Sequence, residues 1–534
     1  MNLSKPLIIL ILVTLISLWP LFSSGFFPSQ DGELHLARIF AYSQALKDGQ
    51  FPVRWASDLN YHYGYPIFNF VYPLPYLASA ILYLSGFSLV ISLKVVLALS
   101  LVLSGLFMYK AVTLWLNNKW AGVAAAIFYL FAPYRFLDVY VRVALGELVA
   151  FIFPPLILWG FFLCLRKKQV KGWVMLVLAL AGLILSHNAL AIMFLPFLLI
   201  FMILEMKLSK ENLFWLGLGT MIAFGLTAFF WLPAMAELKF TLAQYYLSQK
   251  DFHEYFVPLK NLIYMPWGFT KEATPTYLGF VGVLTFILFL WHLVKKKINN
   301  LKGIFFIFSW IISLFLILSW SVFLWEKLPI LPFFQTPWRF LSLTVLVTSL
   351  MLGWLVKTKP FPLFGLIITF LTIILALPAI QIWRQEKVNE EFYRTYPKST
   401  TWHNEGSPIW TAGEADRFPE EPYQIIGKAQ VLNWQRGDTQ HLIKLSAQES
   451  IRFIDQTIFF PGWRVLIDKK PIPIQFQDPL YRGLITFDVP GGDHEIEIVF
   501  GRTKLRLMAE LISVGSLIGL FFLIRSFKIK LEQQ

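Results

Sequence analysis

The first forty residues contain the contrast that decides the fold. Residues 6–22 read PLIILILVTLISLWPLF, and residues 31–35 read DGELH, which places two carboxylates and an imidazole just after an apolar run. A run of this length suits a membrane-crossing helix. Because no small-residue cleavage site follows it, we expect an uncleaved first span rather than a signal peptide. Charges beside a membrane are costly and therefore mark candidates for function.

The composition extends this pattern to the whole chain. Of the 534 residues, 57% are hydrophobic and only 15% are charged, whereas about a quarter of a soluble domain is charged. The net charge of +14 lies in short clusters between apolar runs, and without a compact basic domain it does not indicate nucleic-acid binding. The single cysteine, Cys164, excludes intramolecular disulfides and cysteine-rich metal sites.

We predict a polytopic α-helical membrane protein with about twelve spans. The spans cover residues 6–23, 88–113, 120–137, 148–165, 172–188, 189–206, 213–234, 277–294, 303–324, 338–356, 361–382 and 506–524. The positive-inside rule then places both termini in the cytoplasm, together with basic clusters at 166–171, 207–210, 295–302, 357–359 and 525–530. If the apolar segment 70–85 were a span, the later basic clusters would lie outside the cell. We therefore expect this segment to lie at the outer membrane surface. The predicted location is the cytoplasmic (inner) membrane.

The predicted domains are three. Residues 1–382 form the transmembrane domain, with a first outer loop at 24–87, and residues 506–534 form the last span and a cytoplasmic tail. Between them, residues 383–505 form an extracytoplasmic domain. Alternating polar and apolar residues predict strands there, with turns at 468–470 and 490–493; the strands lie at 451–459, 464–467, 484–489 and 495–500. This pattern is typical of a β-sandwich or jelly roll.

The first polar cluster offers candidate catalytic residues. On a helix, Asp31, His35 and Arg38 are spaced i, i+4 and i+7 and share a face, whereas Glu33 points elsewhere. A carboxylate backed by a histidine can act as a general base, or Asp31 and His35 can help to hold Mg²⁺ or Mn²⁺. The alternative is that Asp31 caps a helix over 30–48 and that His35 is merely amphipathic.

Further candidates lie at the outer ends of later spans. Arg142 could bind a phosphate oxygen, with Asp138 or Glu147 assisting the first cluster; alternatively, Asp138 and Arg142 simply pair at i, i+4. His187 lines a cavity or makes a helix-turn hydrogen bond. Arg339 holds a lipid-linked phosphate or anchors the chain at the interface.

Several motifs carry a resemblance to a known family. They are DGELHLAR at 31–38, GYP at 64–66, YPLPY at 72–76, FAPYR at 131–135, PWRF at 337–340 and FPGWR at 460–464. The chain resembles bacterial membrane proteins labelled 6-pyruvoyl-tetrahydropterin synthase-related, which are similar to the YfhO-type and dolichyl-phosphate-mannose-protein-mannosyltransferase-like branches of the GT-C glycosyltransferase superfamily. Pterin chemistry is not implied, because the metal-binding histidine trio is missing from the sequence.

The resemblance implies a GT-C-like glycosyltransferase at the outer face of the membrane. Its donor would be a sugar on polyprenyl phosphate or diphosphate, and its acceptor a glycan, protein or lipid of the envelope. Asp31 matches the catalytic acid of the first loop; Glu33 departs from the apolar residue expected there, so either carboxylate is a candidate. Arg142, Glu147 and Arg339 match less closely. Two alternatives remain: a transporter or flippase of a lipid-linked substrate, and a non-catalytic envelope assembly protein that works through its β-domain.

Overall fold

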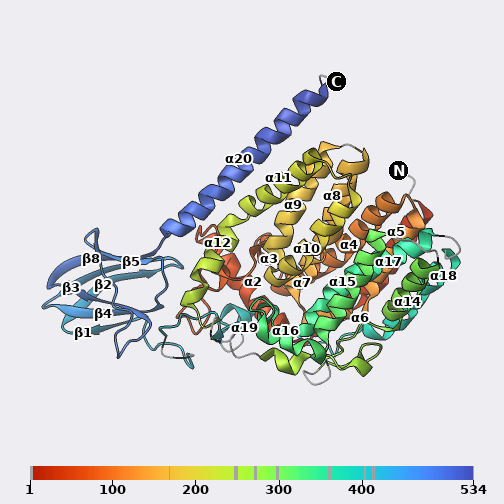
Figure 1. Ribbon diagram of the computed structural model, residues 1–534. Coiled ribbons are helices and arrows are strands. Elements are labelled where there is room, and N and C mark those ends of the chain that lie inside the picture. Colours follow the sequence, from red (N-terminus) through yellow and green to blue (C-terminus); the bar gives the residue numbers. More distant parts are fainter. Residues whose placement is uncertain are drawn as a thin grey trace.

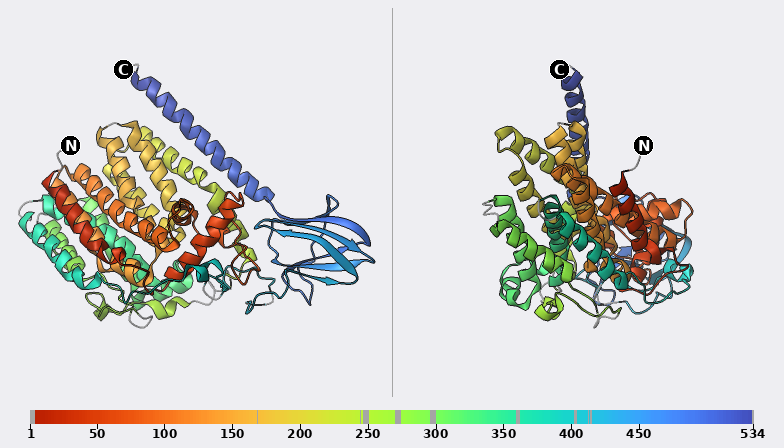
Figure 2. Two further views of the ribbon diagram at one scale, coloured as in Figure 1. Left: turned by 180° about the vertical axis from the view of Figure 1, so that it is seen from behind. Right: turned by 90° about the vertical axis from the view of Figure 1, so that its right-hand side faces the viewer.

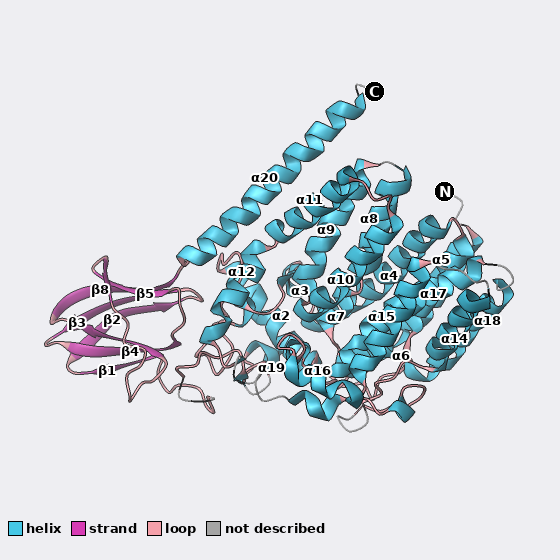
Figure 3. Cartoon of the chain, in the orientation of Figure 1, coloured by secondary structure: helices cyan, strands magenta, loops and turns pink. Residues whose placement is uncertain are grey.

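The computed structural model describes residues 4–167, 169–243, 245, 251–269, 274–295, 300–358, 362–401, 404–411, 413 and 415–532. This part of the chain consists of a helical bundle and a β-sheet domain (Figure 1), and the cartoon coloured by secondary structure shows all arrows in the latter (Figure 3). Both termini lie at one end of the bundle, and the β-domain lies toward the other (Figure 2). Lys168, Lys296, Lys297 and Lys359, which belong to the predicted basic clusters, lie outside the described residues.

The helices follow the apolar segments of the sequence. The first group is α1 Lys5–Leu18, α2 Gly32–Lys47, α3 Pro73–Leu84, α4 Leu89–Leu116, α5 Lys119–Phe131, α6 Pro133–Phe136, α7 Leu145–Ala150, α8 Phe153–Lys167, α9 Val170–Ser186 and α10 Asn188–Glu205. The second group is α11 Lys210–Leu226, α12 Ala228–Glu237, α14 Phe280–Lys295, α15 Leu301–Ile317, α16 Val322–Lys327, α17 Leu341–Lys357, α18 Pro362–Ala376, α19 Glu390–Arg394 and α20 Lys504–Glu532.

Polar residues set several helix ends. The Ser88 hydroxyl accepts a hydrogen bond from the Ile91 amide and caps α4, which ends at Asn117 in the left-handed conformation. The Asn118 side chain then accepts from two amides of α5. Such caps satisfy amides that have no partner within a helix. The junction between α4 and α5 therefore turns within two residues.

Among the described residues, six helices are long and apolar enough to cross a membrane, or up to nine when each bent pair is counted as one span. Three predicted straight spans are bent pairs: 120–137 breaks between α5 and α6 by 50°, 213–234 between α11 and α12 by 67°, and 303–324 after α15 by 89°. Pro133 explains the first break, because proline cannot donate the amide hydrogen bond that would continue α5. Three other predicted spans form shorter apolar helices, namely α9, α14 and the α18 segment, as does α3 in the segment predicted to lie at the surface. The described protein is a helical membrane protein, whereas the twelve-span topology stays a prediction.

The β-domain consists of two antiparallel sheets. Their strands are β1 Tyr423–Ile426, β2 Ala429–Arg436, β3 Gln440–Ala447, β4 Ile451–Ile458, β5 Trp463–Ile467, β6 Lys470–Ile472, β7 Leu484–Val489 and β8 Gly492–Phe500. One sheet has the order β1-β4-β7 and the other β2-β3-β8-β5-β6. Buried residues of both sheets, such as Phe453 and Ile498, belong to one hydrophobic core. The four predicted strands are present, and the predicted turn after β5 has positive φ at Asp468 and Lys469, as a tight hairpin requires.

The segment between the bundle and the sheets runs back along the first outer loop. Phe26 and Glu386 form an isolated antiparallel bridge, with N–O distances of 3.0 and 2.8 Å. Gly25 makes the approach possible, since a Cβ there would lie 2.3 Å from the Glu386 carbonyl oxygen. This segment contains α19, and the sheets themselves begin only at Tyr423.

A buried ionic cluster, called here the Glu237 cluster, joins the first outer loop to α12 and α20. Arg506 on α20 donates from Nε and Nη2 to the two carboxylate oxygens of Glu237, at 3.1 and 2.8 Å. Asn69 Nδ2 donates to the same carboxylate at 2.7 Å, and Arg54 bridges Asn69 Oδ1 (2.9 Å) to Glu510 Oε1 (3.3 Å). These ion pairs hold the first turns of α20, which directly follow the β-domain in the chain, against the bundle.

Candidate functional site

A backbone contact brings the first polar cluster to the end of the third predicted span. The amide of Gln30 donates to the carbonyl oxygen of Val141 at 3.0 Å, and the amide of Asp31 to that of Arg142 at 2.9 Å. The start of α2 is therefore attached to residues more than a hundred positions later in the chain. This contact places Asp31 beside the predicted phosphate-binding residues.

The backbone next to Arg142 has an unusual conformation. Residues Leu137–Arg142 form a π-helical turn, a geometry that is rare and often found at functional sites. Val143 follows with a φ of 56°, in the left-handed region, which a β-branched residue seldom adopts. Strain of this kind persists where the surroundings hold it in place, and it clusters at active sites and ligand-binding segments.

Two guanidinium groups share one carboxylate at this point, in what we call the Glu147 cluster. Arg142 Nη1 donates to Asp138 Oδ1 at 2.7 Å and to Glu147 Oε1 at 3.0 Å. Arg339 Nε donates to the same Glu147 oxygen at 3.0 Å, and the Tyr134 hydroxyl donates to Glu147 Oε2 at 2.7 Å. All five side chains are buried. The simple pair of Asp138 and Arg142 is present, but it is part of a larger cluster.

Neither guanidinium uses all of its donors. The Arg142 guanidinium lies 4.6 Å from the ring centre of Trp338, and Arg339 Nη1 donates to the Phe334 carbonyl at 2.5 Å. Within the described residues, Nε and Nη2 of Arg142 and Nη2 of Arg339 form no hydrogen bond. These N–H groups remain able to bind an anion.

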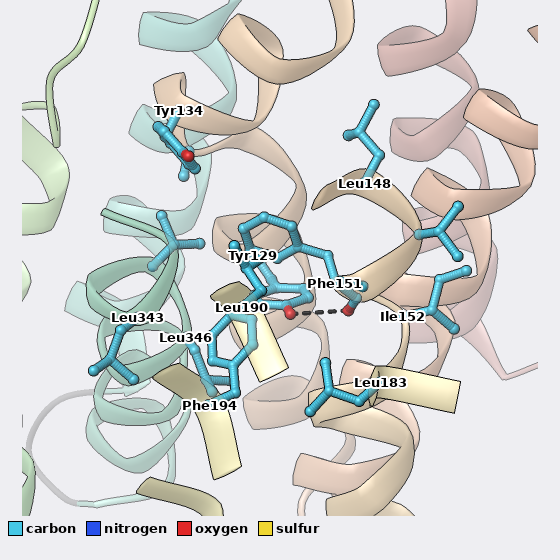
Figure 4. Close-up of a cluster of buried hydrophobic side chains, with 14 of the residues drawn as sticks. Tyr129, Tyr134, Leu148, Phe151, Ile152, Leu183, Leu190, Phe194, Leu343 and Leu346 are labelled. Atoms are coloured by element: carbon cyan, nitrogen blue, oxygen red, sulfur yellow. Dashed lines mark hydrogen bonds between the residues drawn. The ribbon is translucent and has the colours of Figure 1, made fainter. Parts of the chain in front are cut away.

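A cluster of buried hydrophobic side chains packs around Tyr134 of the Glu147 cluster. Figure 4 shows Tyr134 at one edge of a group of buried side chains from several helices. Within the group, the Tyr129 hydroxyl donates to the Phe151 carbonyl at 2.9 Å. Close packing of this kind holds side chains in single rotamers. The Tyr134 hydroxyl is therefore positioned against Glu147 by the core of the bundle.

The Asp31 carboxylate has no partner among the residues that the structure describes. Asp31 occupies the N-cap position of α2, but its side chain forms no capping hydrogen bond; the Gly32 amide donates instead to Ser29 Oγ at 3.2 Å. Within the described part of the chain, the Asp31 carboxylate forms no hydrogen bond or ion pair. Burial raises the pKa of Asp31, and the neighbouring Arg142 and Arg38 only partly oppose this. Asp31 therefore occupies the predicted N-cap position, but its side chain does not make the capping hydrogen bond.

His35 and Arg38 lie on the predicted common face but contact other groups. His35 Nδ1 lies 2.8 Å from the Tyr76 hydroxyl, which also accepts a hydrogen bond from Arg38 Nη1 at 3.0 Å. Arg38 Nε donates to Thr400 Oγ1 at 3.0 Å. Burial, together with Arg38 and Arg142, lowers the pKa of His35 well below its usual value, so the imidazole is neutral. Tyr76 and Thr400 are neighbours that spacing within the first motif could not predict.

Glu33 lies apart from the Asp31 carboxylate, whereas His187 lies near the charges of Glu147, Arg339 and Arg142. Glu33 is exposed and faces a separate hollow of about 170 Å³ with Phe26 and Tyr393. His187 stacks on Tyr72 at 5.0 Å between ring centres, and its Nδ1 accepts from the Leu190 amide at 3.3 Å. His187 thus makes the helix-turn hydrogen bond that the sequence left as an alternative.

The described residues offer no ready-made metal site. Among them, no group of three or more His, Cys, Asp or Glu side chains could hold a metal ion. Asp31 and His35 would have to bind Mg²⁺ or Mn²⁺ as a pair, and Nδ1 of His35 is already beside the Tyr76 hydroxyl. We therefore derive no step that passes through a metal.

Comparison with known proteins gives one relative in sequence. No family model matches the chain. An uncharacterized protein of Lactococcus lactis subsp. cremoris (strain MG1363) is 29% identical over 314 residues, which cover 55% of this chain and 50% of that protein. The chain thus spans about half the length of the curated relative it matches.

Solved membrane glycosyltransferases share a distant likeness. The oligosaccharyltransferase of Archaeoglobus fulgidus, in complex with Zn and sulfate, matches with 16% identity and a TM-score of 0.46 over 72% of this chain and 54% of that one. The same organism's AglB, in complex with an inhibitory peptide and a dolichol-phosphate, matches with 13% identity and a TM-score of 0.46 over 77% and 61%. The arabinofuranosyltransferase AftD from Mycobacteria gives 14% and 0.41 over 77% and 28%. These values are too low to assign an activity, and the narrower labels suggested by the sequence motifs stay predictions.

Proposed function

We propose that the protein is a membrane glycosyltransferase that uses a polyprenyl-phosphate-type sugar donor at the outer face of the cytoplasmic membrane. The observation that carries the proposal is the unpaired Asp31 carboxylate beside two guanidinium groups that share Glu147. A free base next to phosphate-binding donors matches the two requirements of this reaction. The acceptor is a glycan, protein or lipid of the cell envelope.

In the proposed reaction, Asp31 takes the proton from an acceptor hydroxyl. The hydroxyl oxygen bonds to the anomeric carbon of the donor sugar as the bond from that carbon to the phosphate oxygen breaks. Polyprenyl phosphate leaves with the bonding electrons. General-base catalysis of this kind contributes about 10²- to 10⁴-fold to a rate.

Arg142 and Arg339 have the complementary role on the leaving group. Their N–H groups that form no hydrogen bond to the protein donate to the phosphate oxygens, whose negative charge grows as the bond breaks. Guanidinium groups suit this task because their planar fork matches phosphate geometry. Glu147 and Asp138 hold Arg142 in place before the donor arrives.

Two other functions compete with this proposal. A flippase of lipid-linked substrates would need charged groups along a path through the membrane, and a non-catalytic assembly protein would not need an unpaired carboxylate beside buried guanidinium groups. The partly buried Asp31, whose pKa is raised, lowers the stability of the folded protein when it is ionised. We infer that a catalytic role, rather than either alternative, explains why this residue is present.

The test is direct transfer by the purified protein. We expect the full chain in nanodiscs to release polyprenyl phosphate from a labelled polyprenyl-phosphate sugar when envelope acceptors are present. Mass spectrometry of envelope glycans and lipid-linked sugars in a deletion strain identifies the sugar, and reactions with added Mg²⁺, Mn²⁺ or chelator show whether a metal is needed. Movement of intact donor across the bilayer without release of polyprenyl phosphate would indicate a flippase.

A further inference from the structure

A large apolar groove lies between α4, α8, α9 and α20. Its volume is about 650 Å³, within the range of sites that bind small molecules. Figures 1 and 2 show α20 leaning away from the other helices as it approaches its C-terminal end. The groove is lined by Phe107, Trp159, Lys171, Met175, Leu178 and Ile524, among others.

Small residues explain why the groove has this position. Gly160 and Gly172 press α8 and α9 together, since a Cβ on Gly160 would lie 2.8 Å from the Gly172 carbonyl oxygen. Ser513 and Gly225 tie the middle of α20 to the bend between α11 and α12, with Ser513 Oγ donating to the Gly225 carbonyl at 3.0 Å. Only 11% of the apolar window of α20 is buried, although Leu520, Leu523 and Ile524 still pack against the bundle beyond that point.

The lining has one charged group, and it lies at one end. Lys171 belongs to the first turn of α9, is exposed, and forms no ion pair within the described residues. Arg166 and Lys167, in the last turn of α8, precede it by five and four residues in the chain. The groove therefore combines a long apolar wall with a basic mouth. Its complement is a hydrocarbon chain that ends in an anionic headgroup.

We propose that this groove binds a membrane phospholipid with an anionic headgroup, its chain along Trp159 and Leu178 and its phosphate at Lys171. This lipid is not the sugar donor. The phosphate position at Lys171 lies at one end of the 15-residue helix α8 and the Glu147 cluster beyond the other end, about 20 Å away at 1.5 Å per residue, although Phe153 at the near end of α8 also lines the groove. The bound chain fills the space under α20 and holds that helix, and the β-domain before it, against the bundle.

Two variants separate the two parts of the site. Lys171→Gln removes the basic mouth, and Lys210→Gln, at the start of α11 and outside the groove, is its matched control. Met175→Trp fills the groove, and Met221→Trp is its control on an α11 position that is 65% exposed. None of these residues belongs to the Glu147 cluster, so the result does not depend on the proposed transferase activity.

The measurement is native mass spectrometry of the full chain released from nanodiscs of phosphatidylglycerol or phosphatidylcholine. We expect retained phosphatidylglycerol in preference to phosphatidylcholine. We expect Lys171→Gln to reduce that preference about fivefold, which is the effect of one basic residue at a lipid headgroup, and Met175→Trp to abolish retention, while both controls behave as wild type. Equal retention of the two lipids, or equal effects of Met175→Trp and Met221→Trp, would overturn the proposal. Co-purification of polyprenyl phosphate in place of phospholipid would overturn the assigned lipid.

Discussion

The two buried ionic clusters of this protein contain the same kinds of residues but differ in what they leave free. In the Glu237 cluster, both oxygens of Glu237 accept hydrogen bonds, and the two oxygens of Glu510 pair with Arg54 and Arg502. In the Glu147 cluster both oxygens of Glu147 are also engaged, but the Asp31 carboxylate beside it has no partner in the described part of the chain. Buried charge alone therefore does not distinguish the proposed reaction site, whereas the free Asp31 carboxylate marks the site that we propose.

The largest expected effect comes from the unpaired base. Asp31→Asn should lower sugar transfer by about 10²- to 10⁴-fold, the contribution of a general base. It should not lower the melting temperature. Because the pKa of Asp31 is raised above the ordinary value, the ionised carboxylate destabilises the folded state at neutral pH, and asparagine relieves that cost. Transfer assays and thermal unfolding in the same nanodiscs measure both quantities.

Two further variants make that result specific. Asp416→Asn, at an exposed acid in the segment before the β-sheets, should leave transfer unchanged. Glu33→Gln tests the other carboxylate of the motif, which faces a separate hollow. If Glu33→Gln abolishes transfer and Asp31→Asn does not, Glu33 is the base and the assignment of Asp31 is wrong.

The Glu237 cluster, in which both oxygens of the central carboxylate are engaged, should respond in the opposite way. Glu237→Gln leaves the buried Arg506 guanidinium without its counter-charge, and removal of one partner from such a pair costs about 3–5 kcal/mol of unfolding free energy. Folded molecules that remain should keep their transfer rate, since no residue of this cluster reaches Asp31 or Glu147. Denaturant unfolding compared with Glu420→Gln, at an exposed position, measures the loss. If Glu237→Gln had a normal unfolding free energy but reduced transfer, the Glu237 cluster would contribute to the reaction rather than to stability.

The sequence predicted the Glu147 cluster better than the Glu237 cluster. Asp138, Arg142, Glu147 and Arg339 are charged residues at the ends of apolar runs, and that position is visible without a structure. Glu237 and Arg506 also lie near the ends of apolar runs, yet nothing in their spacing indicates that they meet across 269 positions. Pairing between remote segments depends on packing, which local patterns do not encode.

The same limit explains the errors in the first outer loop. Helical spacing correctly separated Glu33 from the face of Asp31, His35 and Arg38. It could not show that Ser29 would take the capping role, or that Thr400 would bind Arg38. The bends at Thr227 and Leu318 were missed because mean apolarity over a span is unchanged by a break in its backbone.

A smaller effect is expected at the second guanidinium of the Glu147 cluster. Arg339→Lys keeps the charge but cannot donate to Glu147 and to the Phe334 carbonyl from one planar group. Loss of one hydrogen bond to a charged group is worth about 1.5–3 kcal/mol, so kcat/KM should fall about tenfold to a hundredfold. Arg502→Lys, at an exposed partner of Glu510, is the matched change in the other cluster and should have no effect on transfer. Equal losses would show that the two clusters act on the reaction alike.

The smallest effect concerns a third polar contact, which joins the β2–β3 turn to the first outer loop. The Ser57 hydroxyl donates to the Asp438 carboxylate, and the Asp438 amide donates to Asp48 Oδ2 at 3.1 Å. Burial raises the pKa of Asp438 to about 7, with Asp58 and Asp48 adding to the shift and Arg436 opposing it. Nearby, Arg436 Nη2 donates to the His62 carbonyl at 2.6 Å.

The sign of the pH dependence follows from that raised pKa. Because the folded-state pKa exceeds the usual value of 3.8, the folded state favours the protonated carboxyl, and this contribution to stability is lost as the pH rises from about 4 to 7. Asp438→Asn should remove that slope and raise the melting temperature of the β-domain at pH 8. The expected rise is about 4 to 8 °C, the shift that 1 kcal/mol gives in a domain of about a hundred residues. An unchanged pH dependence of stability in Asp438→Asn would assign the titration to Asp58 instead. The contact between the β2–β3 turn and residues 48–58 would then still weaken as the pH rises, unlike the Glu237 cluster.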